Sequence, residues 1–308
     1  MRYFLGIDGG ATKTEAVIIN EQGKLIAQTI GDPVNYHQGG IKQTANNLEK
    51  VINKALSSVK LQTMNITSAV FGLAGFDSEQ DKIILQQMAK SLMTGDLADR
   101  VKVVSDVEIA FKSCFDIDYG IVLIGGTGTN CYGRGKNNQQ FRSGGWGWLL
   151  GDQTSGFALG HMALQVIMKA FDGREEKTLL TELVLHKLKL NHASDIVDWA
   201  YQKDVPVAEI AELAPLVFQA FKKGDRVAIN IVKEFIGETM LVVKTVAAKI
   251  NLTDEQFCLG LIGGLFKEEL MVELVRQELK KVLPKAKIVL PKIESVIAAA
   301  YMAKDKEW

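Results

Sequence analysis

The chain has 308 residues, 47% of them hydrophobic, and its 36 Lys and Arg residues balance 36 Asp and Glu residues. This length and apolar content predict about two folded domains, and the neutral charge favours neither nucleic acid nor a membrane surface as a partner. No apolar run approaches the roughly 20 residues of a membrane span. The N-terminus lacks a signal-peptide pattern, so we expect a cytoplasmic protein.

The first part of the chain alternates short β-branched runs with helical stretches. Strands are expected at Tyr3–Ile7, Glu15–Asn20, Lys24–Ile30, Ser68–Leu73 and Val101–Val104, and helices at Gly39–Val59, Glu79–Met93 and Val107–Phe115. Three hairpin-like strands followed by helix and strand units predict a mixed sheet covered by helices.

The same order then restarts as a weak internal repeat. Gly120–Ile124 is an expected strand, Gly125–Asn130 a glycine and threonine turn, and Cys131–Gly135 a return strand. Further helices are expected at Ala163–Phe171, Lys177–Lys187, Val207–Lys222, Val227–Ile250, Lys267–Val282 and Ile293–Lys304, with strands at Phe257–Ile262 and Ala286–Leu290. The repeat predicts two domains of similar plan, the second with a large helical insertion.

Cysteine and histidine give little support to a metal or redox site. Cys114, Cys131 and Cys258 are an odd number without CxxC spacing, which argues against a disulfide framework and a structural zinc site. They are expected to be small buried apolar residues. The four histidines form no HxH or HxxxH arrangement, and His161 is interpreted as a helix residue.

Three glycine pairs follow expected strands: Gly9-Gly10, Gly125-Gly126 and Gly263-Gly264. Such pairs allow positive φ and a close backbone approach to phosphate oxygens, while Asp8 places a carboxylate at the end of the first strand. The first pair alone fits a plain β-hairpin equally well. Three pairs, two with threonines attached, favour a nucleotide, although neither a Walker A loop nor a Rossmann fingerprint is present.

The chain resembles the BadF/BadG/BcrA/BcrD-type ATPase family, which includes N-acetylglucosamine kinase and belongs to the sugar kinase, Hsp70 and actin superfamily. The glycine motifs carry the resemblance, and the glycine- and tryptophan-rich segment Ser143–Asp152 is its most specific part. The resemblance implies an α/β fold of two RNase H-like, actin-like ATPase domains with a central interdomain cleft. The expected domains are residues 1–117 with 293–308, and residues 118–292 with the helical insertion.

The resemblance also implies a nucleotide site for ATP and Mg²⁺. Asp8 matches an aspartate that orients Mg²⁺, directly or through a bridging water. The nucleotide-binding matches are Gly9, Gly10, Thr12, Lys13, Thr14, Gly126, Thr127, Gly128, Gly224, Gly263 and Gly264. Lys13 is also compatible with a solvated hairpin lysine. Ala11 stands where the family often has a third glycine, and its methyl group restricts the hairpin.

Asp106 matches the general base of the family and is the expected catalytic residue. It follows a strand and precedes a helix, so it is placed where α/β sites form and where an aspartate also caps a helix. The implied sugar contacts are Asn35, Asp106, Asn130, Gly145, Trp146, Gly147 and Asp152. Asn130 is alternatively a turn cap, and Trp148 is expected in the core.

The implied function is an ATP-dependent kinase of an amino sugar such as N-acetylglucosamine, acting on the hydroxyl at C6 and forming a homodimer. Glucosamine, N-acetylmuramic acid and a plain hexose stay open as acceptors. One alternative is an ATPase activator of a 2-hydroxyacyl-CoA dehydratase, but the cysteines show no cluster motif. Another is an inactive sugar or nucleotide sensor, against which the joint presence of Asp8, Thr12, Asp106 and Thr127 argues.

Overall fold

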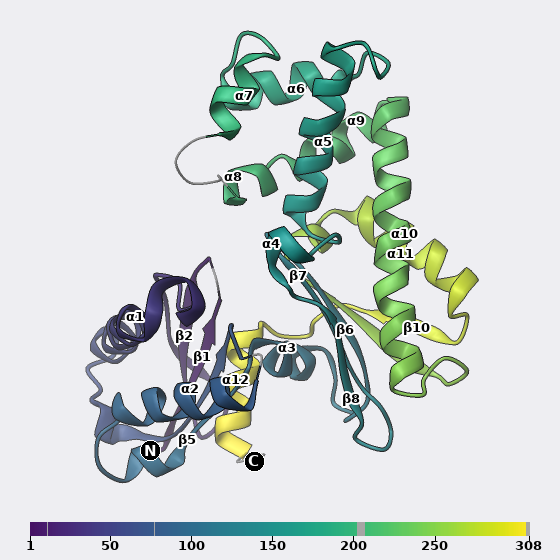
Figure 1. Ribbon diagram of the computed structural model, residues 1–308. Helices are drawn as coiled ribbons and strands as arrows, with labels where there is room; N and C mark the ends of the chain where they lie inside the picture. Colours follow the sequence, from purple (N-terminus) through teal and green to yellow (C-terminus); the bar gives the residue numbers. More distant parts are fainter. Residues whose placement is uncertain (11, 77, 202–206, 306–308) are drawn as a thin grey trace. The chain divides into compact units, whose positions relative to one another are not determined.

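The computed structural model describes residues 1–10, 12–76, 78–201 and 207–305. The chain divides into two compact units (Figure 1). Unit 1 comprises Met1–Asp116 together with Pro291–Trp308, and unit 2 comprises Ile117–Leu290. The chain therefore leaves unit 1 once and returns to it at the end.

Unit 1 is built on a five-stranded sheet of order β3-β2-β1-β4-β5. β1, β2 and β3 form an antiparallel meander, and β4 and β5 continue the sheet parallel to β1. Its elements are β1 (Tyr3–Gly9), β2 (Thr14–Asn20), β3 (Leu25–Gly31), α1 (Tyr36–Ser58), β4 (Ile66–Leu73), α2 (Glu79–Ser91), β5 (Val101–Ser105), α3 (Asp106–Cys114) and α12 (Ser295–Asp305), with short 3₁₀ turns at Thr63–Asn65 and Gly95–Arg100.

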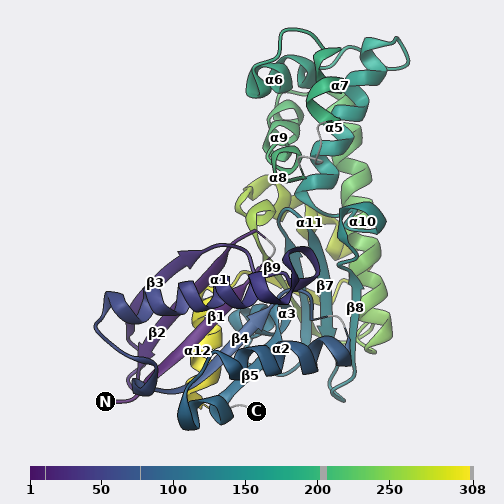
Figure 2. The same cartoon turned by 60° about the vertical axis from the view of Figure 1, so that its left-hand side comes forward.

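The alternation of side chains along these strands builds a core on each face of the sheet. Leu5 and Ile7 belong to the core that residues of α1 and α2 complete. Phe4 belongs to the opposite core, to which α3 contributes Ile109 and α12 contributes small alanines such as Ala299. Within unit 1 the C-terminal helix, yellow in Figure 2, thus covers the sheet face opposite to α1.

Unit 2 repeats the same sheet plan. Its order is β8-β7-β6-β9-β10, with β6, β7 and β8 antiparallel and β9 and β10 parallel to β6. The strands are β6 (Gly120–Gly125), β7 (Thr129–Arg134), β8 (Gln140–Gly144), β9 (Phe257–Ile262) and β10 (Ala286–Val289). The predicted repeat and the α/β class are therefore confirmed.

A helical insertion separates β8 from β9. Most of its helices gather at one end of unit 2, and the long helix that precedes β9 runs from there along the sheet (Figure 1). The helices of unit 2 are α4 (Gly147–Leu150), α5 (Gly156–Phe171), α6 (Leu179–Leu188), α7 (Asp195–Ala200), α8 (Val207–Ala211), α9 (Ala214–Lys222), α10 (Arg226–Lys249) and α11 (Glu269–Val282), with a 3₁₀ turn at Gly264–Lys267. The long α10 contributes Phe235 and Val246 to a core shared with the sheet residues Ile121 and Leu259. Among the described residues, no helix combines the length and apolar character needed to cross a membrane.

Several local predictions were wrong. Neither the strand β8 nor the helix α7 was predicted. α5 begins at Gly156 rather than at Ala163, because the buried Ser155 accepts a hydrogen bond from the Ala158 N–H and caps the helix. The expected helix Val207–Lys222 is two helices, the second of which starts with Pro215 in its first turn.

Candidate functional site

The first glycine hairpin joins β1 to β2 and is held by unit 1 from two sides. Gly9 pairs with Thr14, and the Gly10 N–H donates to the Lys13 carbonyl across the turn at 3.0 Å. The carbonyl of Gly9 accepts from the Ala74 N–H at 2.8 Å, and that of Gly10 accepts from the Val34 N–H at 3.1 Å. The backbone of the hairpin is thus fixed by neighbouring segments before any ligand binds.

The reason for glycine at this hairpin differs from the expected one. Neither Gly9 nor Gly10 adopts a positive φ. A Cβ on Gly9 would lie 2.4 Å from the Val34 side chain and 2.6 Å from that of Leu73, so close packing excludes a side chain here. Ala11, the departure noted in the sequence, lies outside the described residues.

The three polar side chains of the hairpin have different environments. Thr12 is exposed. Lys13 pairs with Glu15, and this hydrogen bond raises the pKa of the lysine. Thr14 is fully buried and donates its hydroxyl to the Asp32 carbonyl at 2.6 Å, so its side chain supports the hairpin rather than facing a ligand.

Asp8 and Asp106 come together at the carboxyl edge of the sheet in unit 1. Asp8 is paired with Gly72 on β4, and Leu73 is paired with Ser105, the last residue of β5. Asp106 follows directly and is the first residue of α3, while the N-cap position belongs to Ser105. Burial, followed by the charge of Asp106, raises the pKa of Asp8 from 3.8 to about 7. A divalent cation beside Asp8 would relieve the repulsion between the two carboxylates.

Asn35 lies at the start of α1, also in unit 1. Its Oδ1 accepts from the His37 N–H at 3.1 Å and caps a short first turn, which Gly40 separates from the rest of α1 with φ of 74°. A Cβ on Gly75 would lie 3.1 Å from this Oδ1. The amide of Asn35 therefore lies beside the loop that follows β4. Ala74, in the same loop, donates its N–H to the Gly9 carbonyl.

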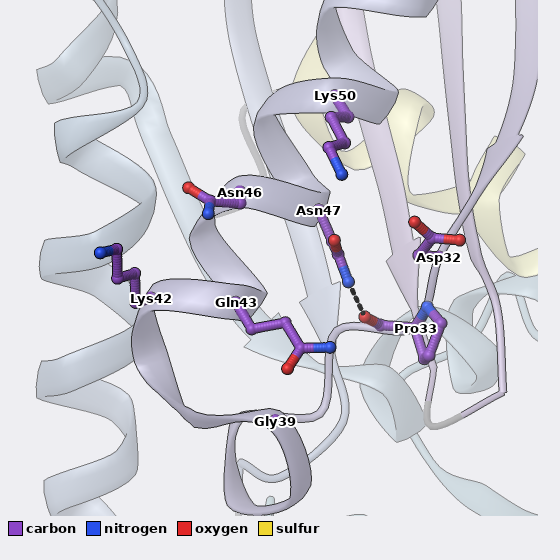
Figure 3. Close-up of a pocket in the computed structure, with 8 residues that line it drawn as sticks. All are labelled: Asp32, Pro33, Gly39, Lys42, Gln43, Asn46, Asn47 and Lys50. Carbon is purple, nitrogen blue, oxygen red and sulfur yellow. Dashed lines mark hydrogen bonds between the residues drawn. The ribbon is translucent and has the colours of Figure 1, made fainter.

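Unit 1 also contains a polar cavity of about 680 Å³ along α1 (Figure 3). It is lined by Asp32, Pro33, Gly39, Lys42, Gln43, Asn46, Asn47 and Lys50. The Asn47 side chain donates to the Pro33 carbonyl at 2.9 Å and so ties α1 to the segment that supports Thr14. None of these eight residues was predicted as a ligand contact.

The second glycine hairpin joins β6 to β7 in unit 2. The Gly126 N–H donates to the Gly128 carbonyl at 2.9 Å, and none of Gly125, Gly126 and Gly128 has a positive φ. Gly263, from the third glycine pair, does have a positive φ of 106°. A Cβ there would lie 2.3 Å from the Gly125 carbonyl oxygen, so the second and third motifs are in direct backbone contact.

The tryptophan-rich segment follows β8 in unit 2. Trp146 is 61% exposed, and the Arg142 guanidinium lies 4.7 Å from its ring centre. Trp148 is 41% exposed and packs against Phe157, so the expectation that it is a core residue was wrong. It lines a cavity of about 480 Å³ instead.

Asp152 and Asn130 connect this segment to the second hairpin. The buried Asp152 carboxylate accepts from the backbone N–H of Gly145 at 3.1 Å, and from those of Thr129, Trp146 and Gly147. Burial raises its pKa, and these hydrogen bonds oppose the shift. Asn130 lies against Gly145, and its buried Oδ1 has no hydrogen-bond partner among the described residues.

Gly224 is exposed in unit 2, two residues after Lys222, whose Nζ lies 2.7 Å from the carboxylate of Glu268, just beyond the third glycine motif. With φ of 79° it forms the turn between α9 and α10. Asp225, its neighbour, caps α10 and also accepts from the Thr178 hydroxyl at 3.0 Å. The left-handed conformation accounts for glycine at this position without a ligand.

The sequence analysis missed Thr129 and Thr154. Both are buried, and their hydroxyl oxygens lie 2.8 Å apart. The sequence offers one clue, because the polar residues 153–155 directly follow Asp152 and end in Ser155, the N-cap of α5. Among the described residues, no cluster of three or more His, Cys, Asp or Glu residues suits a metal ion.

Comparison with known proteins identifies the family. The family model described as the BadF/BadG/BcrA/BcrD ATPase family matches residues 5–303. The chain belongs to this family. It is 33% identical over 310 residues to an N-acetylmuramic acid/N-acetylglucosamine kinase of Clostridium acetobutylicum, with 99% of each chain covered. It is 30% identical over 311 residues to an N-acetyl-D-glucosamine kinase of Dictyostelium discoideum, with 97% of each covered.

A solved structure gives the same fold. The chain superposes with a TM-score of 0.78 on a provisionally assigned N-acetylglucosamine kinase from Chromobacterium violaceum, at 22% identity, covering 98% of this chain and 99% of that one. The predicted family and fold class are therefore confirmed.

Proposed function

We propose that this member of the family is an ATP-dependent kinase that phosphorylates a hydroxyl group of an amino sugar, with N-acetylglucosamine as the leading substrate and the hydroxyl on C6 as the acceptor. The main observation in support of a kinase is that two neighbouring carboxylates, Asp8 and Asp106, lie beside a glycine hairpin in unit 1. The full-length similarity to curated amino-sugar kinases supports the choice of substrate class.

Asp106 accepts the proton of the attacking sugar hydroxyl. A carboxylate in this position makes the oxygen a better nucleophile as the bond to the γ-phosphorus forms. Asp106 lies in the first turn of α3, where the helix dipole attracts negative charge.

Asp8 would hold Mg²⁺, directly or through water, and the cation would neutralise charge on the phosphates. The residues fit this ion, because burial and the charge of Asp106 raise the pKa of Asp8, and a bound cation would offset the same cost of its negative charge. The proposed nucleotide contacts of unit 1 are Gly9, Gly10 and Thr12. Those of unit 2 are the motifs Gly126–Gly128 and Gly263–Gly264. Thr14 supports the first hairpin from within the core.

The proposed sugar contact of unit 1 is Asn35. The proposed contacts of unit 2 are Asn130, Gly145, Trp146 and Gly147. The Asn130 Oδ1, buried and without a partner among the described residues, is a ready acceptor for a sugar hydroxyl or amide N–H. The exposed Trp146 ring offers an apolar face to the pyranose. Asn130 on β7 and Trp146 after β8 thus give unit 2 one polar and one apolar contact for the sugar.

The cysteines give the activator alternative no support. Cys114 is buried in unit 1 and Cys131 in unit 2, and burial raises the pKa of each thiol, that of Cys114 to about 11. Buried, protonated thiols in separate cores are poor ligands for a cluster at the surface.

The test is a coupled ADP-release assay against N-acetylglucosamine, N-acetylmuramic acid, glucosamine and glucose, with the product analysed by NMR. We expect turnover with an N-acetylated amino sugar and a phosphate on C6. The Asp99→Asn variant, at an exposed carboxylate of unit 1, serves as the control for Asp106→Asn. Absence of turnover with every sugar would refute the kinase. A homodimer is a separate proposal, tested by light scattering.

A further inference from the structure

The segment between α4 and α5 contains three buried polar residues, Asp152, Thr154 and Ser155. Asp152 adopts a positive φ of 60°, which is uncommon for a residue with a side chain. Burial of several polar groups in one short connection is costly unless each is hydrogen-bonded. Their partners show what the connection does.

Asp152 links the tryptophan loop to the second hairpin. Its carboxylate accepts backbone N–H groups from Gly145, Trp146 and Gly147 on one side and from Thr129 on the other. A Cβ on Gly128 would lie 2.8 Å from its Oδ2, so the hairpin backbone packs directly on the carboxylate.

Thr154 makes a second link to the same hairpin. Its Oγ1 lies 2.8 Å from the Oγ1 of Thr129, and Thr129 donates its own hydroxyl to the Ile124 carbonyl at 2.9 Å. Because a hydroxyl has a single proton, Thr154 is the donor in this pair. The Thr154 hydroxyl thus completes a chain of hydrogen bonds that ends in β6.

The start of α5 makes the third link. The Gly156 N–H donates to the Gly126 carbonyl at 2.8 Å, and the Phe157 N–H donates to the Thr127 carbonyl at 3.3 Å. These are N-terminal helix amides, which have no partner within the helix. Residues 152–157 therefore hold the hairpin and the tryptophan loop together within unit 2.

We propose that Thr154 is a positioning residue that, together with Asp152, couples the sugar loop to the second phosphate hairpin, so that a bound amino sugar strengthens the binding of the nucleotide. This inference rests on the proposed function. A sugar that binds Gly145–Gly147 restricts the motion of the backbone N–H groups around Asp152. Because residues 152–157 are hydrogen-bonded to Gly126–Thr129, the backbone of this hairpin becomes less mobile as well. Coupling of this kind is reciprocal, so the nucleotide strengthens sugar binding by the same factor.

The test measures the dissociation constant of a non-hydrolysable ATP analogue with Mg²⁺ by calorimetry, with and without saturating N-acetylglucosamine. The ratio of the two constants is the coupling factor. In Thr154→Val we expect this factor to fall about fivefold, as for the loss of one hydrogen bond, while the affinity for sugar alone changes little. Thr154→Ser keeps the hydroxyl and should restore the wild-type factor.

Thr239→Val is the matched control, because Thr239 is an equally buried threonine of unit 2 whose hydroxyl donates to the Phe235 carbonyl within α10. It should keep the wild-type coupling factor. Hydrogen exchange gives a second readout: sugar should protect the amides of residues 125–130 in the wild type and less so in Thr154→Val.

The inference is overturned if the wild type phosphorylates sugar with a coupling factor of one, or if folded Thr154→Val keeps the wild-type factor. In both cases the kinase function stands. A wild type that phosphorylates none of the sugars removes the kinase function and this inference together.

Discussion

Replacing Asp8 by asparagine should make the ligand-free protein more stable and the enzyme inactive. The pKa of Asp8 is raised from 3.8 to about 7, first by burial and then by the charge of Asp106. For a carboxyl group with a raised pKa in the folded state, the unfolded chain loses its proton first as the pH rises. Folding is then penalised progressively above pH 4, and the full penalty is reached above pH 7.

The magnitude follows from the two values. At 1.36 kcal/mol for each pH unit between them, the penalty on the wild type reaches about 4 kcal/mol above pH 7. At pH 5 it amounts to about 1.5 kcal/mol. Asparagine has the same shape and no charge, so Asp8→Asn avoids the penalty at every pH.

The measurement is urea unfolding at pH 5 and pH 8 in the presence of EDTA, followed by circular dichroism and by hydrogen exchange of β1 peptides. The stability advantage of Asp8→Asn should grow by about 2.5 kcal/mol between the two pH values. Asp99→Asn, at an exposed carboxylate of the same unit, should show no such growth. Mg²⁺ with an ATP analogue should stabilise the wild type more than Asp8→Asn. A difference that stays constant with pH, or a destabilised variant, would refute the reasoning.

Three further predictions concern single residues. Asp106→Asn should lower turnover by about 10²- to 10⁴-fold at nearly unchanged urea midpoint, and retention of full kcat would exclude it as the base. Gly263→Ala should lower the free energy of unfolding by about 1–3 kcal/mol in urea titrations, since the new Cβ meets the Gly125 carbonyl; an unchanged midpoint would contradict that contact. Thr14→Val should cost about 1–3 kcal/mol by the same measurement, because the Asp32 carbonyl loses its donor, whereas a loss of ATP affinity at full stability would instead make Thr14 a ligand contact.

Local signals were sufficient for the hairpins and for Asp106. The runs around Gly9 and Gly125 combine β-branched strands with glycine turns, and Asp106 directly follows a strand of this kind. The plan of both sheets follows from these signals, because the same order of hairpin and crossover strands occurs twice. The roles of the site residues stay predictions.

Features that depend on distant partners were not predictable from the sequence. β8 carries Arg142, Ser143 and Gly144, which have little strand propensity, and it is a strand because β7 pairs with it. The need for glycine at position 9 also depends on residues distant in the sequence, since Val34 and Leu73 occupy the space that a Cβ would fill. The bond between Thr129 and Thr154 also depends on packing that no local pattern describes.

The return of the chain to unit 1 has a consequence for the order of folding during synthesis. Unit 2 is one continuous segment, Ile117–Leu290, and its core can close once that segment has left the ribosome. The core of unit 1 is completed later, because α12 packs against Phe4, Val17 and Val70 and is made only after unit 2. Residues made after unit 2 therefore complete the unit that was begun before it. A chain cut short before α12 would leave an apolar sheet face exposed, which favours aggregation.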